Sequence, residues 1–262
     1  MKVLITGASG GIGYAVVEYL AKQNIEIFAC DVTKIDFPKH VTYFNLDVTD
    51  IDSINKIKNH FIDNDIKLDA IINIAGIFAI DSFIEIDNDT LRKLFDVNLF
   101  GTILVNKTLH PCLNENGRII ITTSEVAPLD PMPFNGIYNT TKTALDCYGQ
   151  ALRQELNLIG QKVITIRPGA FNTNLSLSSL TLTKELSEKT VLYKKQSGKF
   201  YNLVKGFMGA PSNPTKIAPI YYKALTKKRP KIIYKKHTNK LLKLLSVLPK
   251  KLQCFIVKTL LK

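Results

Sequence analysis

Three features are scarce in this sequence: long apolar runs, paired cysteines and, in its last forty residues, acidic side chains. No stretch approaches the roughly 18 uninterrupted apolar residues that a membrane-spanning helix needs. Strand-like sequence follows Met1 directly, without the charged and apolar regions of a secretory signal, so we expect a cytoplasmic protein. A chain of 262 residues with an ordinary apolar share suits one α/β domain with a sizeable core.

The cysteines are scattered through the chain, with no C-x-x-C pair and no neighbouring histidine. This spacing is typical neither of a zinc site nor of a disulfide framework, and reduced core thiols are the simplest interpretation. We therefore expect no bound metal. The four cysteines are Cys30, Cys112, Cys147 and Cys254.

Acidic residues are missing from residues 223–262, whereas this stretch carries 13 Lys and Arg. The whole chain has 35 basic and 22 acidic residues, so the first 222 residues hold 22 of each. The net charge of +13 is therefore confined to a basic tail. Such a distribution argues against a basic surface spread over the whole protein and indicates a tail with a role of its own.

The most specific motif lies near the start of the chain. Residues 2–5 predict a buried strand and residues 14–21 a helix, and a glycine-rich loop joins them. A loop without Cβ atoms lets backbone N–H groups approach a pyrophosphate, and a helix N-terminus attracts the same anion. A tight turn is the alternative for a glycine loop alone, but the flanking elements favour a dinucleotide-binding βαβ unit. The candidate cofactor contacts are Gly7, Ser9, Gly10, Gly11, Ile12 and Gly13.

A second expected strand, residues 25–30, ends at Asp31, which lies 18 residues after Gly13. The acid that binds the adenosine ribose of a dinucleotide lies about 20 residues past the glycine loop. A carboxylate there accepts hydrogen bonds from both ribose hydroxyls and repels a 2′-phosphate, so NAD is favoured as cofactor. NADP stays an alternative, because Lys34 is near and Asp31 could merely cap a turn.

Strands and helices alternate through the middle of the chain. Runs rich in Ile, Val and Leu predict strands at residues 41–46, 68–74, 117–124 and 162–167, with a candidate seventh at 231–234. Helical periodicity predicts helices at residues 50–64, 88–109 and 136–158. Such strands suit a parallel sheet covered on both faces, in which ligands bind outside the carboxyl ends of the strands. The residues expected at that edge are Gly7, Asp31, Asp47, Asn73, Ser124 and Pro168.

Tyr138 and Lys142 stand four residues apart at the start of an expected helix and so share one of its faces. A phenol with a pKa of about 10 is a poor acid–base catalyst at neutral pH, and we expect the neighbouring ammonium to lower that pKa. Ser124, at the end of the preceding strand, can donate a hydrogen bond to a substrate oxygen. Each residue alone has an ordinary structural explanation, but together with the glycine loop they predict a catalytic site.

With these motifs in place, residues 1–220 resemble a classical short-chain dehydrogenase/reductase. The resemblance implies a Rossmann sheet in the order 3-2-1-4-5-6-7 and a catalytic tetrad completed by Asn98. By this resemblance Tyr138 is the general acid/base and Ser124 holds the substrate oxygen. Lys142 would also contact the nicotinamide ribose, and Asn98 would hold a water that links Lys142 to solvent. The family commonly forms homodimers or homotetramers, and we expect one of these.

The resemblance also implies further cofactor contacts. Asp47 and Val48 would border the adenine. Asn73, Ala75 and Gly76 would pack beside the adenosine side, where Ile74 replaces the usual second Asn of the family. The nicotinamide would be held by Pro168, Gly169 and Thr173.

Periodicity weakens in residues 171–214, which the resemblance identifies as a substrate loop that closes like a lid. Residues 184–207 are candidates for helix. Several apolar side chains in or near this loop could be either core or pocket, and together they favour an apolar substrate of fatty-acyl, prenyl, retinoid or steroid-like character. They are Phe78, Pro131, Met132, Pro133, Phe134, Phe171, Leu175 and Phe207.

We divide the chain into a Rossmann domain, residues 1–235, and a basic tail, residues 236–262. Leucines and lysines alternate at helical spacing in residues 239–248 and 251–261, which Pro249 separates. Two basic amphipathic helices of this kind are typical of an anchor on anionic membrane surfaces. The alternative is docking on the same chain or on a second subunit. A nucleic-acid role is disfavoured, because within the basic residues 223–262 only Tyr234 and Phe255 could stack on bases.

The sequence thus predicts an oxidoreductase that transfers a hydride between NAD(P) and an apolar hydroxy or keto compound. An NADPH-dependent 3-oxoacyl or other ketone reductase is the alternative within the same chemistry. A non-catalytic, dinucleotide-sensing membrane adaptor is the alternative from a different class, in which the tail would be the functional part.

Overall fold

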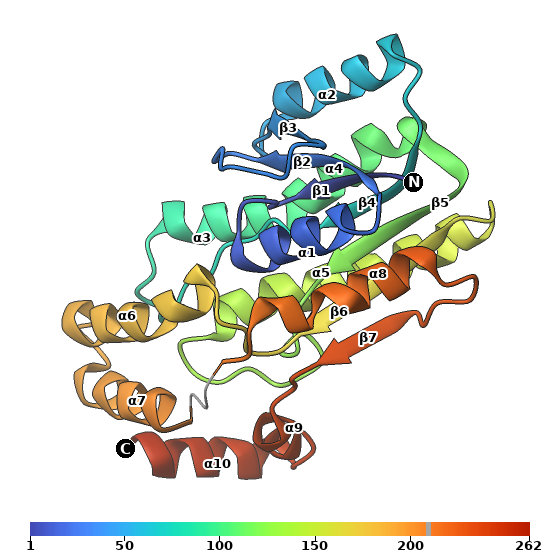
Figure 1. Ribbon diagram of the computed structural model, residues 1–262. Coiled ribbons are helices and arrows are strands. Elements are labelled where there is room, and N and C mark those ends of the chain that lie inside the picture. Colours follow the sequence, from blue (N-terminus) through green and yellow to red (C-terminus); the bar gives the residue numbers. More distant parts are fainter. Residues whose placement is uncertain (208–210) are drawn as a thin grey trace.

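The structure, a computed structural model, describes residues 1–207 and 211–262, without the side chains of residues 174–177 and 207. The described residues form one sheet of seven parallel strands in the order β3-β2-β1-β4-β5-β6-β7, as expected (Figure 1). The α/β class and the strand order are therefore confirmed. The strands are β1 (Lys2–Thr6), β2 (Glu26–Asp31), β3 (Val41–Asn45), β4 (Leu68–Asn73), β5 (Leu113–Thr122), β6 (Lys162–Pro168) and β7 (Ile233–Lys236).

Helices cover both faces of the sheet, because alternate residues of each apolar strand point to opposite sides. Val3 and Ile5 of β1 pack with α1 (Gly11–Ala21) and α8 (Ala218–Thr226). Leu4, between them, packs in a second cluster on the other face. The helices over that face are α2 (Ile51–Asp63), α4 (Gly101–Leu109) and α5 (Gly136–Asn157).

The single helix expected at residues 88–109 is interrupted. It consists of α3 (Asn88–Phe95), a π-helical turn, η1 (Asp96–Phe100), and α4. A π-helical turn inserts an extra residue and rotates the following side chains. Asn98 lies in this turn and is fully buried. Its position therefore depends on an irregularity that the apolar periodicity of the sequence does not reveal.

Two other elements differ from the expectation. Strand β5 begins at Leu113, where its register against β4 shifts, and it ends at Thr122, so Ser124 lies just beyond the strand. Helix α8 was not expected. Its Tyr221 is fully buried and hydrogen-bonds Thr122 Oγ1 over 2.7 Å.

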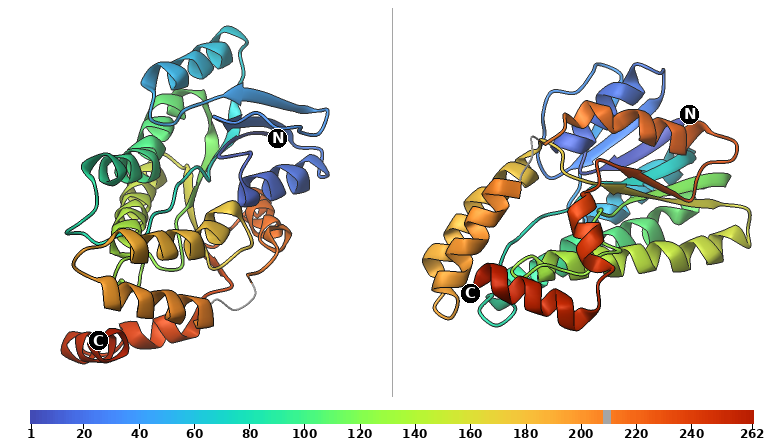
Figure 2. Two further views of the ribbon diagram at one scale, coloured as in Figure 1. Left: turned by 90° about the vertical axis from the view of Figure 1, so that its left-hand side faces the viewer. Right: turned by 90° about the horizontal axis from the view of Figure 1, so that it is seen from below.

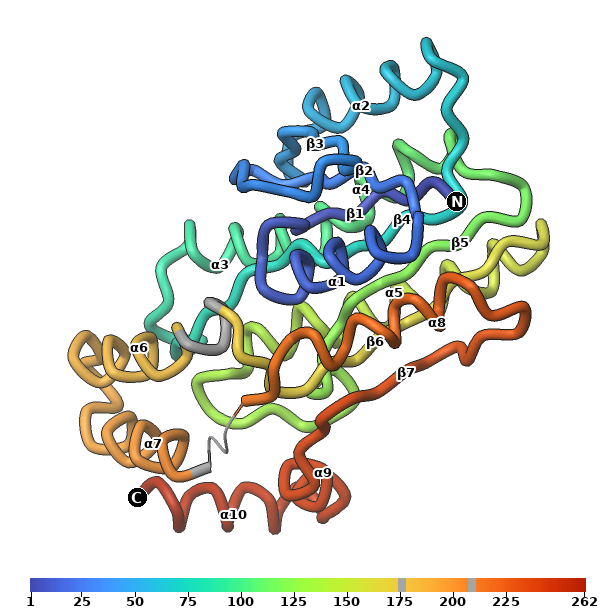
Figure 3. The backbone as a smooth tube through the Cα atoms, in the orientation of Figure 1, coloured from blue at the N-terminus to red at the C-terminus, as the bar shows by residue number. Residues whose placement is uncertain are grey.

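The substrate loop and the tail are largely helical. They form α6 (Asn174–Lys189), α7 (Lys194–Phe207), α9 (Lys240–Ser246) and α10 (Lys250–Leu261). These helices gather beyond the carboxyl edge of the sheet, and α10 lies beside α7 (Figure 2). The chain can be followed from β7 through α9 to its end at α10 in Figure 3. In the described ranges no helix is both long and apolar enough to cross a bilayer.

Candidate active site

The glycine loop forms a tight cradle at the end of β1. Gly7 has a φ of +68°, and a Cβ there would lie 2.6 Å from the backbone nitrogen of Ala75. A Cβ on Gly13 would lie 1.9 Å from the carbonyl oxygen of Gly7. Helix α1 has no side-chain cap at its N-terminus, so its first N–H groups face the loop without a competing side chain. This arrangement fits a pyrophosphate group.

Asp31 lies beside this loop. Its carboxylate accepts hydrogen bonds from the N–H groups of Ser9 and Thr33, each over 3.0 Å. Carboxylate oxygens accept more than one hydrogen bond each, so the group retains capacity for ribose hydroxyls. Asp47 instead accepts hydrogen bonds from the N–H and hydroxyl of Thr49. Val48 is buried against Gly101, the first residue of α4. Adenine contacts of the last two stay predictions.

Tyr138 and Lys142 share the inner face of α5 and are both buried. The Nζ of Lys142 lies 5.8 Å from the centroid of the Tyr138 ring, and Phe78 packs edge-on against the same ring at 4.8 Å. Burial raises the pKa of Tyr138 to about 12, which a hydrogen bond with the Ser124 side chain opposes. Burial also lowers the pKa of Lys142 to about 8. The expected lowering of the phenol pKa by Lys142 is therefore wrong for this structure, because burial removes the phenolate from water and raises the pKa.

Asn98 connects the segment after β4 to helix α5. Its Oδ1 accepts from the N–H of Ile77 over 2.8 Å, and its Nδ2 donates to the Ile77 carbonyl and to Thr141 Oγ1 over 2.9 and 3.1 Å. A Cβ on Gly76 would lie 3.1 Å from Asn98 Oδ1 and 3.2 Å from Lys142 Nζ. The side chain of Asn98 thus fixes the wall around Lys142, and its predicted water contact stays a prediction.

The ends of β5, β6 and β7 are joined next to Ser124. The N–H of Glu125 donates to the Pro168 carbonyl over 2.7 Å, and the N–H of Gly169 donates to the Lys236 carbonyl over 2.8 Å. A Cβ on Gly169 would lie 1.8 Å from the carbonyl oxygen of His237, so only glycine fits there. The loop after β6 therefore begins immediately beside the catalytic candidates.

Beyond Gly169 the same loop crosses the glycine-rich cradle. A Cβ on Gly11 would lie 2.6 Å from Thr173 Cγ2. Thr173, predicted to hold the nicotinamide, thus lies against Gly11, predicted to hold the pyrophosphate.

Asn73 is directed away from the cradle. It is buried, and its Nδ2 donates to Asn106 Oδ1 over 2.8 Å, while Asn106 Nδ2 donates to the Tyr148 hydroxyl over 3.3 Å. This network ties β4 to α4 and α5, and a cofactor contact for Asn73 stays a prediction. Asn106 was not expected from the sequence, where nothing distinguishes it from the other polar residues of α4.

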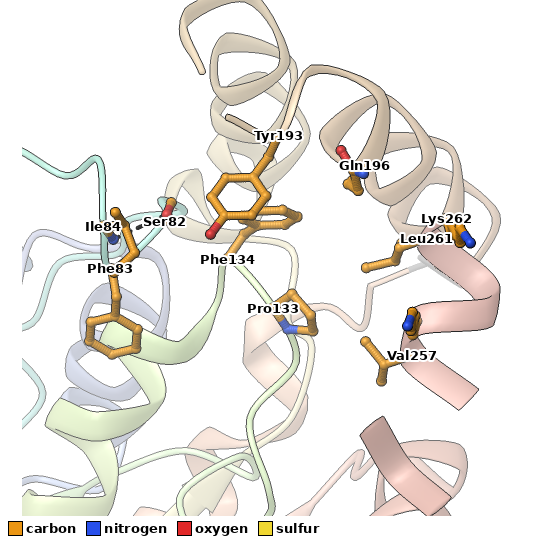
Figure 4. A pocket seen from close by; sticks show the side chains of 11 residues that line it. Ser82, Phe83, Ile84, Pro133, Phe134, Tyr193, Gln196, Val257, Leu261 and Lys262 are labelled. Carbon is orange, nitrogen blue, oxygen red and sulfur yellow. Dashed lines mark hydrogen bonds between the residues drawn. The ribbon is translucent and has the colours of Figure 1, made fainter. Parts of the chain in front are cut away.

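Residues 171–214, with helices α6 and α7, are the predicted lid. An apolar cavity of about 520 Å³ lies between α7 of this lid, the loop before α5 and the tail helix α10. Figure 4 shows Pro133, Phe134 and Tyr193 between the loop of Phe83 and the tail helix α10. The Phe134 ring packs edge-on against Tyr193 and Phe200 at 5.5 and 5.3 Å, and its φ is +64°. A positive φ is unusual for a bulky residue and holds the ring in this cluster just before Tyr138.

The predicted pocket residues divide between several places. Pro133 and Phe134 line the cavity, Met132 packs in the cluster beside it, and Phe78 covers Tyr138. Phe171 belongs instead to the core under α8 and packs against His237. Pro131 is exposed. The side chains of Leu175 and Phe207 lie outside the described part of the structure.

Two carboxylates that the sequence did not single out hold the tip of the lid. Asp81 is buried and pairs with Lys189 of α6 over 2.6 Å. Glu85 accepts hydrogen bonds from the three residues that follow Lys189. The donors are the Thr190 hydroxyl and the backbone N–H groups of Val191 and Leu192. No local pattern distinguishes these acids from ordinary surface residues.

The tail docks on the same chain, which was one of the two expected alternatives. Asp130 is the centre of this contact. Its carboxylate pairs with Lys250 and accepts from Gln253 Nε2 over 2.8 Å, and its N–H donates to Ser246 Oγ over 3.0 Å. The side chain of Leu261 is buried in a cluster with Leu186 of α6 and Phe200 of α7.

Comparison with known proteins agrees with this geometry. A family model described as short chain dehydrogenase matches residues 1–181. Estradiol 17-beta-dehydrogenase 2 of Mus musculus is 31% identical over 190 residues, which cover 66% of this chain and 49% of that protein. The NADPH-dependent 1-acyldihydroxyacetone phosphate reductase of Schizosaccharomyces pombe is 32% identical over 201 residues, 73% of this chain and 67% of that protein. The chain thus spans about half the length of the mouse relative.

A solved structure shows the same fold. It is a short chain dehydrogenase family protein from Francisella tularensis, with a TM-score of 0.73 at 23% identity, over 89% of this chain and 96% of that one.

Proposed function

Because the chain belongs to the short-chain dehydrogenase family, we propose that it is an NAD(P)-dependent oxidoreductase that interconverts a hydroxyl and a keto group. One observation carries the proposal: Tyr138 and Lys142 are buried side by side on α5, with the Ser124 side chain near the phenol, at the sheet edge that holds the glycine loop. The nicotinamide, when bound, supplies or accepts the hydride. Tyr138 transfers the proton to or from the substrate oxygen, and Ser124 hydrogen-bonds that oxygen.

The protonation states favour proton donation in the structure as it stands. Burial keeps the pKa of Tyr138 at about 12, so the phenol holds its proton at neutral pH and can donate it to a carbonyl oxygen. Oxidation of an alcohol needs the phenolate. Closer approach of the Lys142 ammonium, now 5.8 Å from the ring centroid, would stabilise that form.

NAD is the cofactor that the cradle favours. The Asp31 carboxylate lies beside the glycine loop, held by Ser9 and Thr33, where it would repel a 2′-phosphate. If NADPH protected the protein against heat better than NADH at equal concentration, an NADPH-dependent ketone reductase would be the better description.

The substrate that the site favours is apolar. Phe78 covers Tyr138, and Phe134 lies four residues before it, in the wall of an apolar cavity. Two relatives are named for a steroid alcohol and for an acylated ketone. We include in this proposal a homodimer or homotetramer, and association of the basic tail with anionic membranes.

Substitution of Tyr138 tests the enzymatic proposal. Tyr138→Phe removes the hydroxyl and keeps the ring, so NADH should still raise the melting temperature while turnover falls about 10²- to 10⁴-fold. Tyr148→Phe removes a phenol from the same helix and should keep most of its turnover. The readout is NAD(P)H absorbance with a panel of long-chain, isoprenoid and steroid-like alcohols and ketones. Unchanged turnover in Tyr138→Phe would refute the assignment.

A further inference from the structure

The two tail helices are docked on one side and apolar on the other. In α10 the positions turned to the body follow each other at intervals of four, at Gln253, Val257 and Leu261. Leu252 and Phe255 lie on the opposite side of this helix and are exposed, as is Leu260 on its flank. The apolar face expected from the sequence is therefore the outer face, and a different set of residues makes the docking contact.

Helix α9 also carries exposed apolar side chains, and we define the outer face of the tail by these residues together with Leu252, Phe255 and Leu260. Leu241, Leu244 and Val247 recur at intervals of three, so they project from one side of the helix, and all are exposed. The exposed fractions reach 60% for Leu244, 71% for Val247 and 65% for Phe255. Isolated exposed apolar residues need no explanation, but six on two consecutive helices indicate an interaction surface. Figures 1 and 2 place both helices at the periphery of the molecule.

The charge around this surface indicates its partner. Residues 189–262 contain 19 Lys and Arg and no Asp or Glu. The pairing of Lys250 with Asp130 occupies one lysine, and five others on the two helices are exposed without an acidic partner among the described residues. These are Lys240, Lys243, Lys251, Lys258 and Lys262.

Of the possible occupants, an anionic bilayer satisfies both the apolar and the charged groups. Leucine and phenylalanine enter the boundary of the acyl chains, while the flanking lysines contact phosphate and carboxylate head groups. A second copy of the chain would bring the same five lysines against each other, which like-charge repulsion opposes.

We propose that α9 and α10 bind an anionic bilayer through this outer face while they remain docked on the body. This inference rests on the membrane association proposed above and specifies its surface. Val257 and Leu261 stay packed against the lid helices α6 and α7. The side of the protein that carries these helices is therefore the side that lies next to the membrane. The apolar cavity is lined by Val257, Leu261 and two of the lysines, so it opens beside the lipid surface.

The chain contains no tryptophan, so a single introduced indole reports its own surroundings. In full-length protein, Phe255→Trp and Leu244→Trp should show a blue shift of emission with vesicles that contain phosphatidylserine. A weaker response is expected with phosphatidylcholine alone and at high salt, which screens the lysines. The control is Leu158→Trp, exposed at the opposite edge of the sheet, whose emission should not change.

Vesicle flotation separates the two faces of the tail. Leu244→Ser/Phe255→Ser should lower binding at least about tenfold, because two inserted side chains lose their apolar burial. The matched variant Leu158→Ser/Ile159→Ser, which also removes two exposed apolar side chains, should bind like the unchanged protein. Val257→Ala/Leu261→Ala, on the docked face, should bind anionic vesicles at least as well as the unchanged protein.

The outcomes discriminate between this inference and the proposals it rests on. If the unchanged protein binds anionic vesicles but the outer-face variant binds equally well, the inference is refuted and membrane association stands. If the docked-face variant loses binding instead, the tail binds by undocking and the inference is again refuted. If the unchanged protein does not bind, membrane association fails as well. Turnover of soluble substrate in the same samples tests the oxidoreductase assignment independently.

Discussion

The buried carboxylate of Asp81 pairs with Lys189, the last residue of α6, over 2.6 Å. The two residues are 108 positions apart in the sequence. Together with the hydrogen bonds that Glu85 accepts from the same turn, this pair fastens the tip of the lid to the loop beside Tyr138. If residues 171–214 act as the predicted lid, its opening would break a charged contact with one buried partner.

Removal of this contact should loosen the lid. Lys189→Met leaves the Asp81 carboxylate without its cation. We expect the closed state to lose about 1 kcal/mol of free energy relative to the open state, so the equilibrium constant for opening should rise about fivefold. Hydrogen exchange at the N–H groups of Val191 and Leu192 should accelerate accordingly, since both depend on the closed lid. Lys184→Met removes an exposed pair with Glu188 on the same helix and should not change this exchange. Equal acceleration in both variants would contradict the fastening role.

The pH dependence of ketone reduction should report Lys142. Its pKa of about 8 lies well below that of Tyr138, about 12, so between these values Lys142 is neutral while the phenol keeps its proton. Because the proposed site uses a charged Lys142, kcat/KM should fall as pH rises through about 8. Lys142→Arg keeps a cation at all accessible pH values and should remove this descending limb. An unchanged limb in Lys142→Arg would assign it to another group.

Gly13 and Gly10 should differ sharply in their tolerance of alanine. A Cβ on Gly13 would lie 1.9 Å from the Gly7 carbonyl oxygen, whereas a Cβ on Gly10 meets only an ordinary contact at 3.5 Å. Gly13→Ala should therefore lower the free energy of unfolding by about 3 kcal/mol or more, since the contact is with backbone. Gly10→Ala should keep nearly full stability. Denaturant titration of both variants tests the cradle without any cofactor.

The charge of Asp31 should set the choice between the two nicotinamide cofactors. Asp31→Asn removes the repulsion of a 2′-phosphate, and its single amide oxygen keeps one of the two hydrogen bonds that the carboxylate accepts from the N–H groups of Ser9 and Thr33. The ratio of NADPH to NADH affinity should rise about tenfold, equivalent to about 1.4 kcal/mol. Asp36→Asn, an exposed acid in the following loop, is the control and should leave this ratio unchanged. Isothermal titration with each cofactor measures both.

Much of the site edge could be predicted from the sequence. The apolar strands, the glycine loop and the Tyr138–Lys142 spacing are local patterns, and they place Asp31, Ser124 and Pro168 at one edge of the sheet. The arrangement around Lys142 could not be predicted. It depends on the π-helical turn that buries Asn98 and on the hydrogen bonds that Asn98 accepts from and donates to the Ile77 backbone, which no periodicity in the sequence predicts.

The pKa of Tyr138 shows the same limit. A sequence places a cation four residues away but does not report how completely both groups are removed from water, and here burial outweighs proximity. The outer face of the tail is a second case. Its amphipathic pattern was evident, but which side docks was settled by Asp130, more than a hundred residues earlier in the chain.

The order of the strands in the sheet was implied by the family resemblance. What the sequence by itself determined is the place of the strands along the chain, the edge that carries the site and the residue types gathered there. These follow from side-chain periodicity and backbone freedom, which act over a few residues. Only the tertiary structure decided the protonation of Tyr138 and Lys142, the fastening of the lid and the exposed side of the tail. Burial and charge pairing depend on groups far apart in the chain, and folding alone brings those groups together.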